Sequence, residues 1–306
     1  MIDFHVGCAR LANPFQQVLN NHKGPFEAYG MEFIQYSPGR YLPTSKTLYK
    51  NTFRLKLIYP DIIIVQNSLH KYFQGGFNVF DFSYLEMLSS IKELYSGLRV
   101  ANVGEVILSK PEFECPLIVE NPETFYKSLI SYKNIPFLDL SYKGKLFGKY
   151  LETDTYKLKA YSKYQQMKTE PKSYKEFVNI YPDQVNYLKR VLRLELQIKK
   201  SRFLKLGQAL KIEDLSDQRI IRTIYDQLAT KFSRSLYSPN LEALNALNES
   251  DLSRYAIMTH TNQLFAIRLR EINKSRYDYY KRKVISSNTP SFIGEKIKQK
   301  ASTLLL

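Results

Sequence analysis

A tyrosine flanked by lysines is the most chemically suggestive feature of the sequence, in the stretch TYKLKAYSKYQQ at 155–166. Apolar or small residues alternate here with polar ones, which predicts a β-strand with two different faces. One face would carry Lys157, Lys159, Tyr161 and Lys163. A phenol has a pKa of about 10, so it becomes a nucleophile for phosphoryl transfer only beside positive charge or a metal ion. The stretch is therefore either a phosphate-binding active site or an ordinary solvated strand face.

A second two-faced strand is predicted at VLRLELQIKK, residues 191–200, where leucines alternate with polar residues. Its polar face would carry Arg193, Glu195, Gln197 and Lys199. If this strand pairs with the first one, a single sheet surface presents the tyrosine, a carboxylate, a carboxamide and several cations. The same residues also fit a solvated surface with cross-strand Lys–Glu pairs.

Candidate metal ligands lie in two other stretches. Glu112 and Glu114 are two positions apart in the strand-like segment 104–119, which is interrupted by prolines, so both side chains would point the same way. Carboxylates suit a hard cation such as Mg²⁺ or Mn²⁺. His70 lies in a predicted strand and is the third candidate. Each has a structural alternative, because exposed glutamates are common and an isolated histidine is often a hydrogen-bonded core residue.

Composition indicates a soluble protein with a polyanionic partner. The chain has 306 residues, of which 44% are hydrophobic, and a formal net charge of +16. Residues 141–211 hold 17 Lys/Arg against 6 Asp/Glu, and residues 267–300 hold 10 against 3. Clustered cations of this kind favour nucleic acid, through neutralisation of phosphates, over an acidic membrane surface.

Several function classes and locations are disfavoured by what the sequence does not contain. It has no run of about 18 apolar residues for a membrane helix and no pattern typical of a secretory signal. It has no P-loop, HExxH, CxxC or GxSxG motif. Its two cysteines are widely spaced, which favours a reducing compartment. We therefore expect a cytoplasmic protein without a membrane partner.

The expected fold is α+β, with an antiparallel-type β-sheet and flanking helices. Residues 1–50 are rich in turns and show few clear elements, whereas 53–59 and the segment after 61 predict a hairpin. Ser83 and Glu86 form a capping box for a helix over 83–98. From residue 202 the hydrophobic periodicity becomes helical. We expect an α+β domain over 1–200, followed by a mostly helical, basic region over 201–306.

Four segments together resemble the filamentous-phage gene II/X replication proteins and related phage and plasmid replication initiators. They are MID at the start, NSLHKYFQGGFNVFDF at 67–82, YKLKAYSKYQQ at 156–166 and RLELQIKKSRFLKLGQALKIEDL at 193–215. Their order and spacing match those of that family. The chain departs from the family pattern at Ser162, where the family has Asp in "YDK", and it lacks a paired His-hydrophobic-His motif.

The resemblance implies a metal-dependent, site-specific DNA endonuclease and strand transferase with a tyrosine nickase-like fold, acting in rolling-circle replication. Such an enzyme nicks one strand at a double-stranded origin, holds the 5′-phosphate on a tyrosine and rejoins the strand, with Mg²⁺ or Mn²⁺ as cofactor. Its partners are origin duplex and single-stranded DNA, together with a host helicase or polymerase of the bacterial cell. The alternatives are a non-catalytic origin DNA- or RNA-binding protein and a structural protein that coats nucleic acid.

The residue pattern and the resemblance together lead us to expect roles for individual residues. Tyr161 is expected to be the nucleophile, with Tyr164 and Tyr156 left open as substitutes, and Lys163 to stabilise the phenolate or the phosphate. The expected metal ligands are His70, Glu112, Glu114 and Glu195. The expected DNA contacts are Lys71, Asn78, Lys157, Lys159, Gln165, Arg193, Lys199, Arg276 and Lys281.

Overall fold

The fold is α+β and is built on a large antiparallel sheet. The computed structural model describes residues 1–12, 26–28, 31–37, 40–43, 53–59, 62–204, 209–238, 250, 273, 275, 279 and 291–306. Within these residues, eleven strands form the main sheet in the order β10-β11-β12-β13-β7-β1-β6-β5-β4-β3-β2, and three form a small sheet in the order β14-β8-β9. Every described strand pair is antiparallel, as the sequence predicts.

The elements have the following bounds. The strands are β1 (Ile2–Arg10), β2 (Phe26–Ala28), β3 (Met31–Ser37), β4 (Arg40–Pro43), β5 (Phe53–Tyr59), β6 (Ile62–Ser68), β7 (Ile107–Ile118), β8 (Leu129–Tyr132), β9 (Ile135–Pro136), β10 (Leu138–Tyr142), β11 (Lys145–Glu152), β12 (Tyr156–Ser162), β13 (Val191–Ile198) and β14 (Leu236–Tyr237). The α-helices are α2 (Leu69–Phe73), α3 (Tyr84–Gly97), α4 (Pro122–Ser128), α5 (Lys163–Lys168), α6 (Pro171–Ile180), α7 (Val185–Arg190), α8 (Gln218–Ser233) and α13 (Ser291–Leu304). Short 3₁₀ helices occupy Pro182–Gln184, Ser201–Leu204 and Glu213–Ser216.

The N-terminal segment is more regular than its composition suggests. Strand β1 lies near the middle of the main sheet, between β6 and β7. The expectation of few clear elements in residues 1–50 is therefore wrong for β1, and β2, β3 and β4 also lie in that range. The sequence IDFHVGCAR alternates apolar and polar or small residues, a periodicity that is typical of a strand.

Two local predictions are confirmed. Strands β5 and β6 pair as an antiparallel hairpin. Helix α3 begins with a capping box, since Ser83 Oγ accepts from the amide of Glu86 and the Glu86 carboxylate accepts from the amide of Ser83. Both features are local in sequence, which explains why the residue pattern is sufficient to predict them.

Strand β7 runs without a break through Pro111 and Pro116, so the expected interruptions do not occur. Pro111 follows Lys110, which has a φ of 54° where the pairing with β1 is irregular. The amide of Glu114 donates to the carbonyl oxygen of Met1, so the nitrogen of Pro116, two residues later, faces the same edge. Strand β1, whose first residue Ile2 pairs with Phe113, does not extend as far as Pro116. The missing N–H of Pro116 therefore removes no hydrogen bond between β7 and β1.

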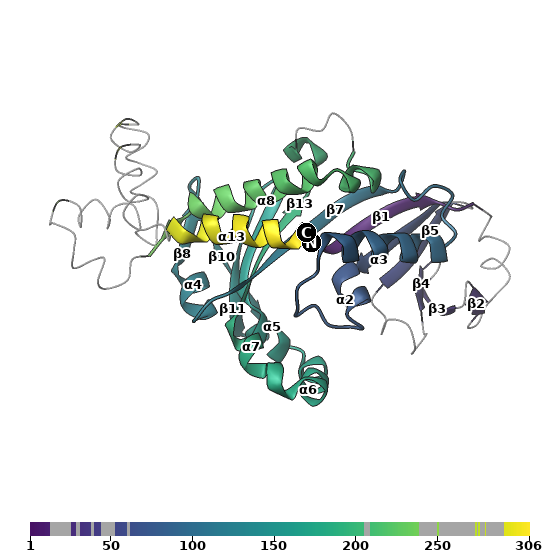
Figure 1. The fold of residues 1–306 in the computed structure, drawn as a ribbon, viewed down its shortest axis with the longest axis horizontal. Helices are drawn as coiled ribbons and strands as arrows, with labels where there is room; N and C mark the ends of the chain where they lie inside the picture. The colour runs from purple at the N-terminus through teal and green to yellow at the C-terminus, as the bar shows by residue number, and fades with distance from the viewer. Residues whose placement is uncertain are drawn as a thin grey trace.

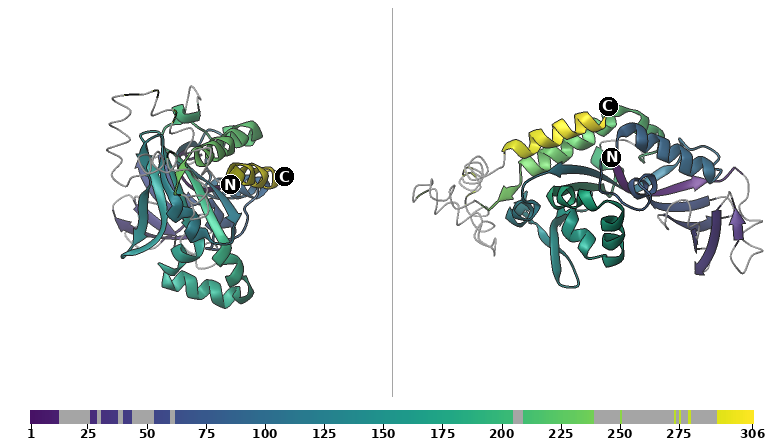
Figure 2. Two further views of the ribbon diagram at one scale, coloured as in Figure 1. Left: turned by 90° about the vertical axis from the view of Figure 1, so that its left-hand side faces the viewer. Right: turned by 60° about the horizontal axis from the view of Figure 1, so that its bottom comes forward.

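Helices cover both faces of the curved main sheet. Helices α3, α8 and α13 lie along one face, and α5, α6 and α7 lie on the other (Figures 1 and 2). Ile221 and Leu228 of α8, with Ile293 and Ile297 of α13, belong to the same buried core as the sheet residues. The C-terminal helices thus share the hydrophobic core of the first 200 residues rather than packing by themselves. In the part of the chain that the structure describes, no helix has the length and apolar character needed to cross a bilayer.

Candidate active site

The two strands that the sequence singles out are neighbours. Strand β12 pairs with β13, and β13 pairs with β7, so Lys159 lies opposite Glu195 and Glu195 lies opposite Glu114. Residues opposite each other in an antiparallel pair point to the same face. The expectation of one polar sheet surface is confirmed. Tyr161 and Arg193 form the next cross-strand pair on this surface.

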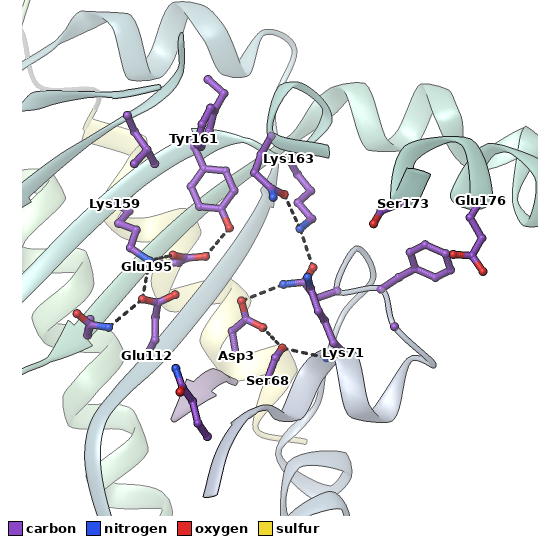
Figure 3. A pocket seen from close by; sticks show the side chains of 18 residues that line it. Asp3, Ser68, Lys71, Glu112, Lys159, Tyr161, Lys163, Ser173, Glu176 and Glu195 are labelled. Atoms are coloured by element: carbon purple, nitrogen blue, oxygen red, sulfur yellow. Dashed lines mark hydrogen bonds and ion pairs between the residues drawn. The ribbon is translucent and has the colours of Figure 1, made fainter. Parts of the chain in front are cut away.

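Tyr161 is hydrogen-bonded to a carboxylate at the floor of a cavity. Its hydroxyl donates to Glu195 Oε1 at 2.5 Å, and only 6% of the residue is exposed. Figure 3 shows the phenol pointing toward Glu195, with Lys159 beside it. Across the sheet on β11, Gly148 lies opposite Tyr161, and a Cβ at Gly148 would clash with the tyrosine's own Cβ. The glycine therefore makes room for the tyrosine.

The cavity has a volume of about 830 Å³ and is lined by polar and charged side chains from several elements. Its lining residues are Asp3, Gln66, Ser68, Lys71, Gly76, Phe77, Asn78, Glu112, Leu140, Phe147, Lys159, Tyr161, Lys163, Gln166, Ser173, Glu176, Glu195 and Gln197. Eight of the residues singled out in the sequence are among them: Lys71, Asn78, Glu112, Lys159, Tyr161, Lys163, Glu195 and Gln197.

Asp3 is a site residue that the sequence analysis does not find. It lies on β1 where the register with β7 shifts, and such a bulge re-aims side chains. Ser68 Oγ donates to Asp3 Oδ1 at 2.8 Å, and the Asn78 side-chain amide donates to Asp3 Oδ2 at 2.9 Å. The alternation of apolar and polar residues in β1 could have predicted a strand with Asp3 on its polar face. Nothing in the residue types indicates that Asp3 lies near Glu112.

Three carboxylates gather at the floor of the cavity and could hold a hard cation. Asp3, Glu112 and Glu195 each place one oxygen within 4.8 Å of the others. The Lys159 ammonium already lies between two of them, 2.5 Å from Glu112 Oε2 and 3.0 Å from Glu195 Oε2. The carboxylate oxygens thus converge on a point that already holds a positive charge. Converging carboxylate oxygens are the ligands that Mg²⁺ or Mn²⁺ requires.

The electrostatics of the floor reflect crowded negative charge. Burial raises the pKa of Glu112 well above its usual value, and the neighbouring Glu195 raises it further. Burial also opposes ionisation of Glu195, but the ammonium of Lys159, a hydrogen bond with Glu112 and the charge of Arg193 together outweigh it and hold the Glu195 pKa below its ordinary value. Burial and the adjacent Glu195 raise the pKa of Tyr161 well above 10. The phenol therefore stays protonated unless a base takes up its proton or added positive charge stabilises the phenolate.

A buried ion network lies beside the floor, on the same face of the sheet. Arg193 Nη1 lies 2.5 Å from Glu114 Oε2 and 3.5 Å from Asp3 Oδ2, and the same guanidinium donates to the carbonyl oxygen of Asn78. Glu114 also contacts Nδ1 of His70, whose ring stacks on Phe82 with 4.9 Å between centroids. Burial lowers the pKa of His70 more than Glu114 raises it, so the imidazole is neutral near pH 7.

This network corrects two expectations. Arg193 is 0% exposed, so it cannot contact DNA as expected and instead holds Glu114 and Asp3 in place. His70 lies on helix α2, capped by Ser68, and not on a strand. Asp3, His70 and Glu114 also place ligand atoms within 4.8 Å of one another. Asp3, Glu112 and Glu195 all line the cavity, whereas His70 and Glu114 do not, so the Asp3–Glu112–Glu195 group is the better placed to hold a metal ion that contacts a substrate.

Lys163 forms the side of the cavity opposite the carboxylates. It is the first residue of α5, and its ammonium donates to Asn78 Oδ1 at 2.6 Å and to Gln166 Oε1 at 2.9 Å. Ser162 caps this helix by accepting from the amide of Gln165, a role for which serine is well suited. Burial, followed by the charges of Arg193 and Lys71, lowers the pKa of Lys163 to about 7.

The depressed pKa of Lys163 predicts a pH-dependent stability difference. Below pH 7 the lysine is charged in the folded and the unfolded chain, and burying that charge destabilises the fold. Between about 7 and its ordinary value of 10.5 only the unfolded chain keeps the proton, so the free energy of unfolding rises with pH. We therefore expect the stability of Lys163→Met relative to the native chain to fall by about 3 kcal/mol from pH 6 to pH 9.

Urea unfolding at both pH values measures this difference. Lys168→Met, at the exposed end of the same helix, serves as the control and should change stability equally at pH 6 and pH 9. A constant difference between Lys163→Met and the native chain would contradict the buried, easily deprotonated lysine.

The remaining expected site residues lie away from the cavity or outside the described residues. Lys157 and Lys199 both pair with Glu152, at 3.2 and 3.0 Å. The side-chain amide of Gln165 donates to Glu123 Oε1 at 2.6 Å. Arg276 and Lys281 fall outside the described residues, so their role as DNA contacts stays a prediction.

No protein-family model matches the chain, and no curated protein matches it either. The chemistry of the cavity is therefore the main basis for a functional proposal.

Proposed function

We propose that the chain is a metal-dependent DNA endonuclease and strand transferase that nicks one strand at a replication origin through a Tyr161–5′-phosphate intermediate and later rejoins it. The observation that carries the proposal is the hydrogen bond of 2.5 Å between the Tyr161 hydroxyl and Glu195, at the floor of a cavity that is also lined by three lysines, Lys71, Lys159 and Lys163. A nucleophile, a proton acceptor and phosphate-binding cations are thus close together.

A divalent metal ion fits the charge and the ligands of this site. The carboxylates of Asp3, Glu112 and Glu195 line the cavity, and one oxygen of each lies within 4.8 Å of the others. A divalent cation at this point would favour the ionised form of Glu112, whose pKa is raised well above its usual value by burial and by Glu195. Asp3, Glu112 and Glu195 would hold Mg²⁺ or Mn²⁺, which supplies Lewis-acid stabilisation of the negative charge on the phosphate.

Each step of the transfer has a residue suited to it. The Tyr161 oxygen attacks the phosphorus and its proton moves to Glu195, while the bond between phosphorus and the 3′-oxygen breaks and that oxygen takes up a proton from water to become a 3′-hydroxyl. Lys163 and Lys71 line the same cavity and neutralise the phosphate. In the reverse direction, a 3′-hydroxyl attacks the phosphotyrosine, the phosphodiester re-forms and the phenol recovers its proton. The strand is therefore rejoined without ATP.

This activity would start rolling-circle replication of a phage or plasmid in the bacterial cytoplasm. The free 3′-hydroxyl left by the nick is the end that a host polymerase extends, and a host helicase would open the duplex ahead of it. Support for this wider role comes from the ordered resemblance of the four sequence segments to replication initiators and from the clustered basic residues of the chain.

The proposal is tested with supercoiled DNA of the replicon that encodes the chain. With Mn²⁺ or Mg²⁺ we expect open circles and a protein–DNA adduct that survives denaturing electrophoresis, and neither should form with excess chelator. Binding without any nick, with every divalent metal tried, would instead favour a non-catalytic DNA-binding protein. Equal binding of RNA in that case would favour an RNA- or nucleic-acid-coating role.

The position of Lys159 predicts an unusual effect on metal affinity. Its ammonium occupies the space between Glu112 and Glu195, so it competes with a metal ion for the same oxygens. We expect Lys159→Met to bind Mn²⁺ on the order of 10-fold more tightly than the native chain, because a like charge a few ångströms away is removed. Calorimetric titration with Mn²⁺ in the absence of DNA measures the change.

Two further variants serve as controls for the Mn²⁺ titration. Lys157→Met lies on the same strand but removes an ammonium that pairs with Glu152 outside the cavity, and it should leave the affinity unchanged. Glu112→Gln removes a ligand and should weaken Mn²⁺ binding by at least about 10-fold. Weaker binding by Lys159→Met would show that the lysine assists the metal rather than competing with it.

A further inference from the structure

The hairpin formed by β10 and β11 projects from one edge of the main sheet beside the candidate active site. Strand β10 is the last strand of the sheet, and in the right-hand view of Figure 2 the hairpin extends outward next to α5, α6 and α7. Lys143 and Gly144 connect its strands with φ angles of 48° and 75°. Two consecutive positive φ values are typical of a tight type I′ turn, so the hairpin ends in a compact, defined tip.

The tip combines exposed apolar surface with positive charge. Tyr142, the last residue of β10 before the turn, is 49% exposed, which is unusual for a large apolar residue of a strand. The ammonium of Lys143 lies 5.4 Å from the centre of the Tyr142 ring, and Lys145 is exposed beside it. An aromatic ring with neighbouring lysines is the arrangement that stacks on a nucleobase while binding the phosphate backbone.

The base of the same hairpin forms a wall of the cavity. Leu140 of β10 and Phe147 of β11 are lining residues, and the Phe147 ring meets the Tyr161 ring edge-on with 6.2 Å between centroids. The hairpin thus connects the exposed Tyr142 at its turn with the buried Tyr161 at the floor of the cavity. On the far side of the cavity, Ser173 and Glu176 come from α6 (Figure 3).

The cavity is too small to hold duplex DNA. Its volume of about 830 Å³ is typical of a pocket for a small molecule, and Tyr161 at its floor is almost completely buried. A scissile phosphate can reach the phenol only if its nucleotides leave the base-paired stack, which costs unpairing and unstacking free energy. A structural element next to the cavity is needed to stabilise the opened junction.

We propose that the β10–β11 hairpin separates the two DNA strands beside the scissile phosphate. Tyr142 stacks on the base pair at the junction, Lys143 and Lys145 bind the flanking phosphates, and Leu140 and Phe147 guide the freed strand toward Tyr161. The ligand of this surface is a junction between paired and unpaired DNA. The inference rests on the proposed nicking function, and it adds strand separation as a distinct activity of the same chain.

The first test compares nicking of paired and unpaired substrates. The double variant Tyr142→Ala/Lys145→Ala changes only exposed tip residues, and Leu85→Ala/Lys92→Ala, on the exposed side of α3, is the matched control. We expect the tip variant to nick single-stranded DNA at the native rate and to lose at least about 10-fold on fully paired DNA, the loss expected for one base–aromatic stack. Equal rates on paired DNA, or equal losses on both substrates, would overturn the proposal.

The second test measures strand separation without nicking. In a Tyr161→Phe background, permanganate oxidation reports unpaired thymines on supercoiled DNA of the replicon. The native hairpin should produce reactive thymines, and the tip variant should not. Absence of opening with the native hairpin overturns the inference. A chain that opens DNA but never nicks it, even with Tyr161 present, would instead disprove the proposed enzyme and leave strand separation intact.

Discussion

Replacement of Tyr161 by phenylalanine should abolish nicking and the covalent adduct while the protein remains folded. The exchange removes only the hydroxyl that donates to Glu195, and the Glu195 carboxylate keeps its ion pair with Lys159. Without the phenolic oxygen no phosphotyrosine can form. We expect the nicking rate to fall by roughly 10⁴-fold or more, as is usual when a covalent nucleophile is removed. Conversion of supercoiled DNA to open circles measures the rate.

The other two tyrosines of the motif provide matched controls. Tyr164 packs edge-on against Tyr174, and Tyr156 lies against Phe203 and below the ammonium of Lys231. Neither lines the cavity. Tyr164→Phe and Tyr156→Phe should therefore keep most of the native rate. Nicking that survives in Tyr161→Phe and is lost in one of these variants would assign the nucleophile to that tyrosine instead.

Replacement of Arg193 by methionine should be the most destabilising single substitution at the site. The guanidinium is fully buried and pairs with Glu114 and Asp3, so its loss leaves two carboxylates in the interior without their main counter-charge. Breaking a buried ion pair from one side typically costs about 3–5 kcal/mol of unfolding free energy. Urea unfolding at pH 7 measures the loss, which should be accompanied by reduced nicking because Asp3 loses its position.

A surface lysine near the end of the same strand shows what an ordinary ion pair contributes. Lys199 pairs with Glu152 at 3.0 Å, but its side chain is 26% exposed and that of Glu152 is 41% exposed. Lys199→Met should therefore cost no more than about 1 kcal/mol. A loss of similar size for Arg193→Met would mean that water or a rearranged side chain compensates the buried carboxylates, which would contradict the proposed rigid support of the floor.

Much of the fold could be predicted from the sequence because the relevant signals are local. The alternation in 155–163 and 191–200 predicts β12 and β13, and Ser83 with Glu86 predicts the start of α3. The alternation also predicts that Tyr161 and Glu195 share a surface once the strands pair. Strand β1 carried the same kind of signal, but the many turn-forming residues that follow it in the first 50 positions concealed it.

Other parts of the site depend on contacts between residues far apart in the chain. Asp3 meets Glu112 and Glu195 only because β1 is inserted beside β7 with a shifted register. The residue types of His70, Glu114 and Arg193 suggested ligands and DNA contacts, whereas their burial makes them an internal ion network. Neither strand order nor burial can be inferred from the spacing of charged residues.

The sequence by itself therefore determined which residues could share a strand face, since side-chain direction follows the two-residue repeat of the backbone. Only the tertiary structure decided which of those faces is solvated and which is enclosed. For Tyr161 the decision came from the hairpin and helices that surround the strand and form a cavity. The physical reason is that a charged or phenolic group changes its chemistry when water is removed, and that depends on residues from the whole chain.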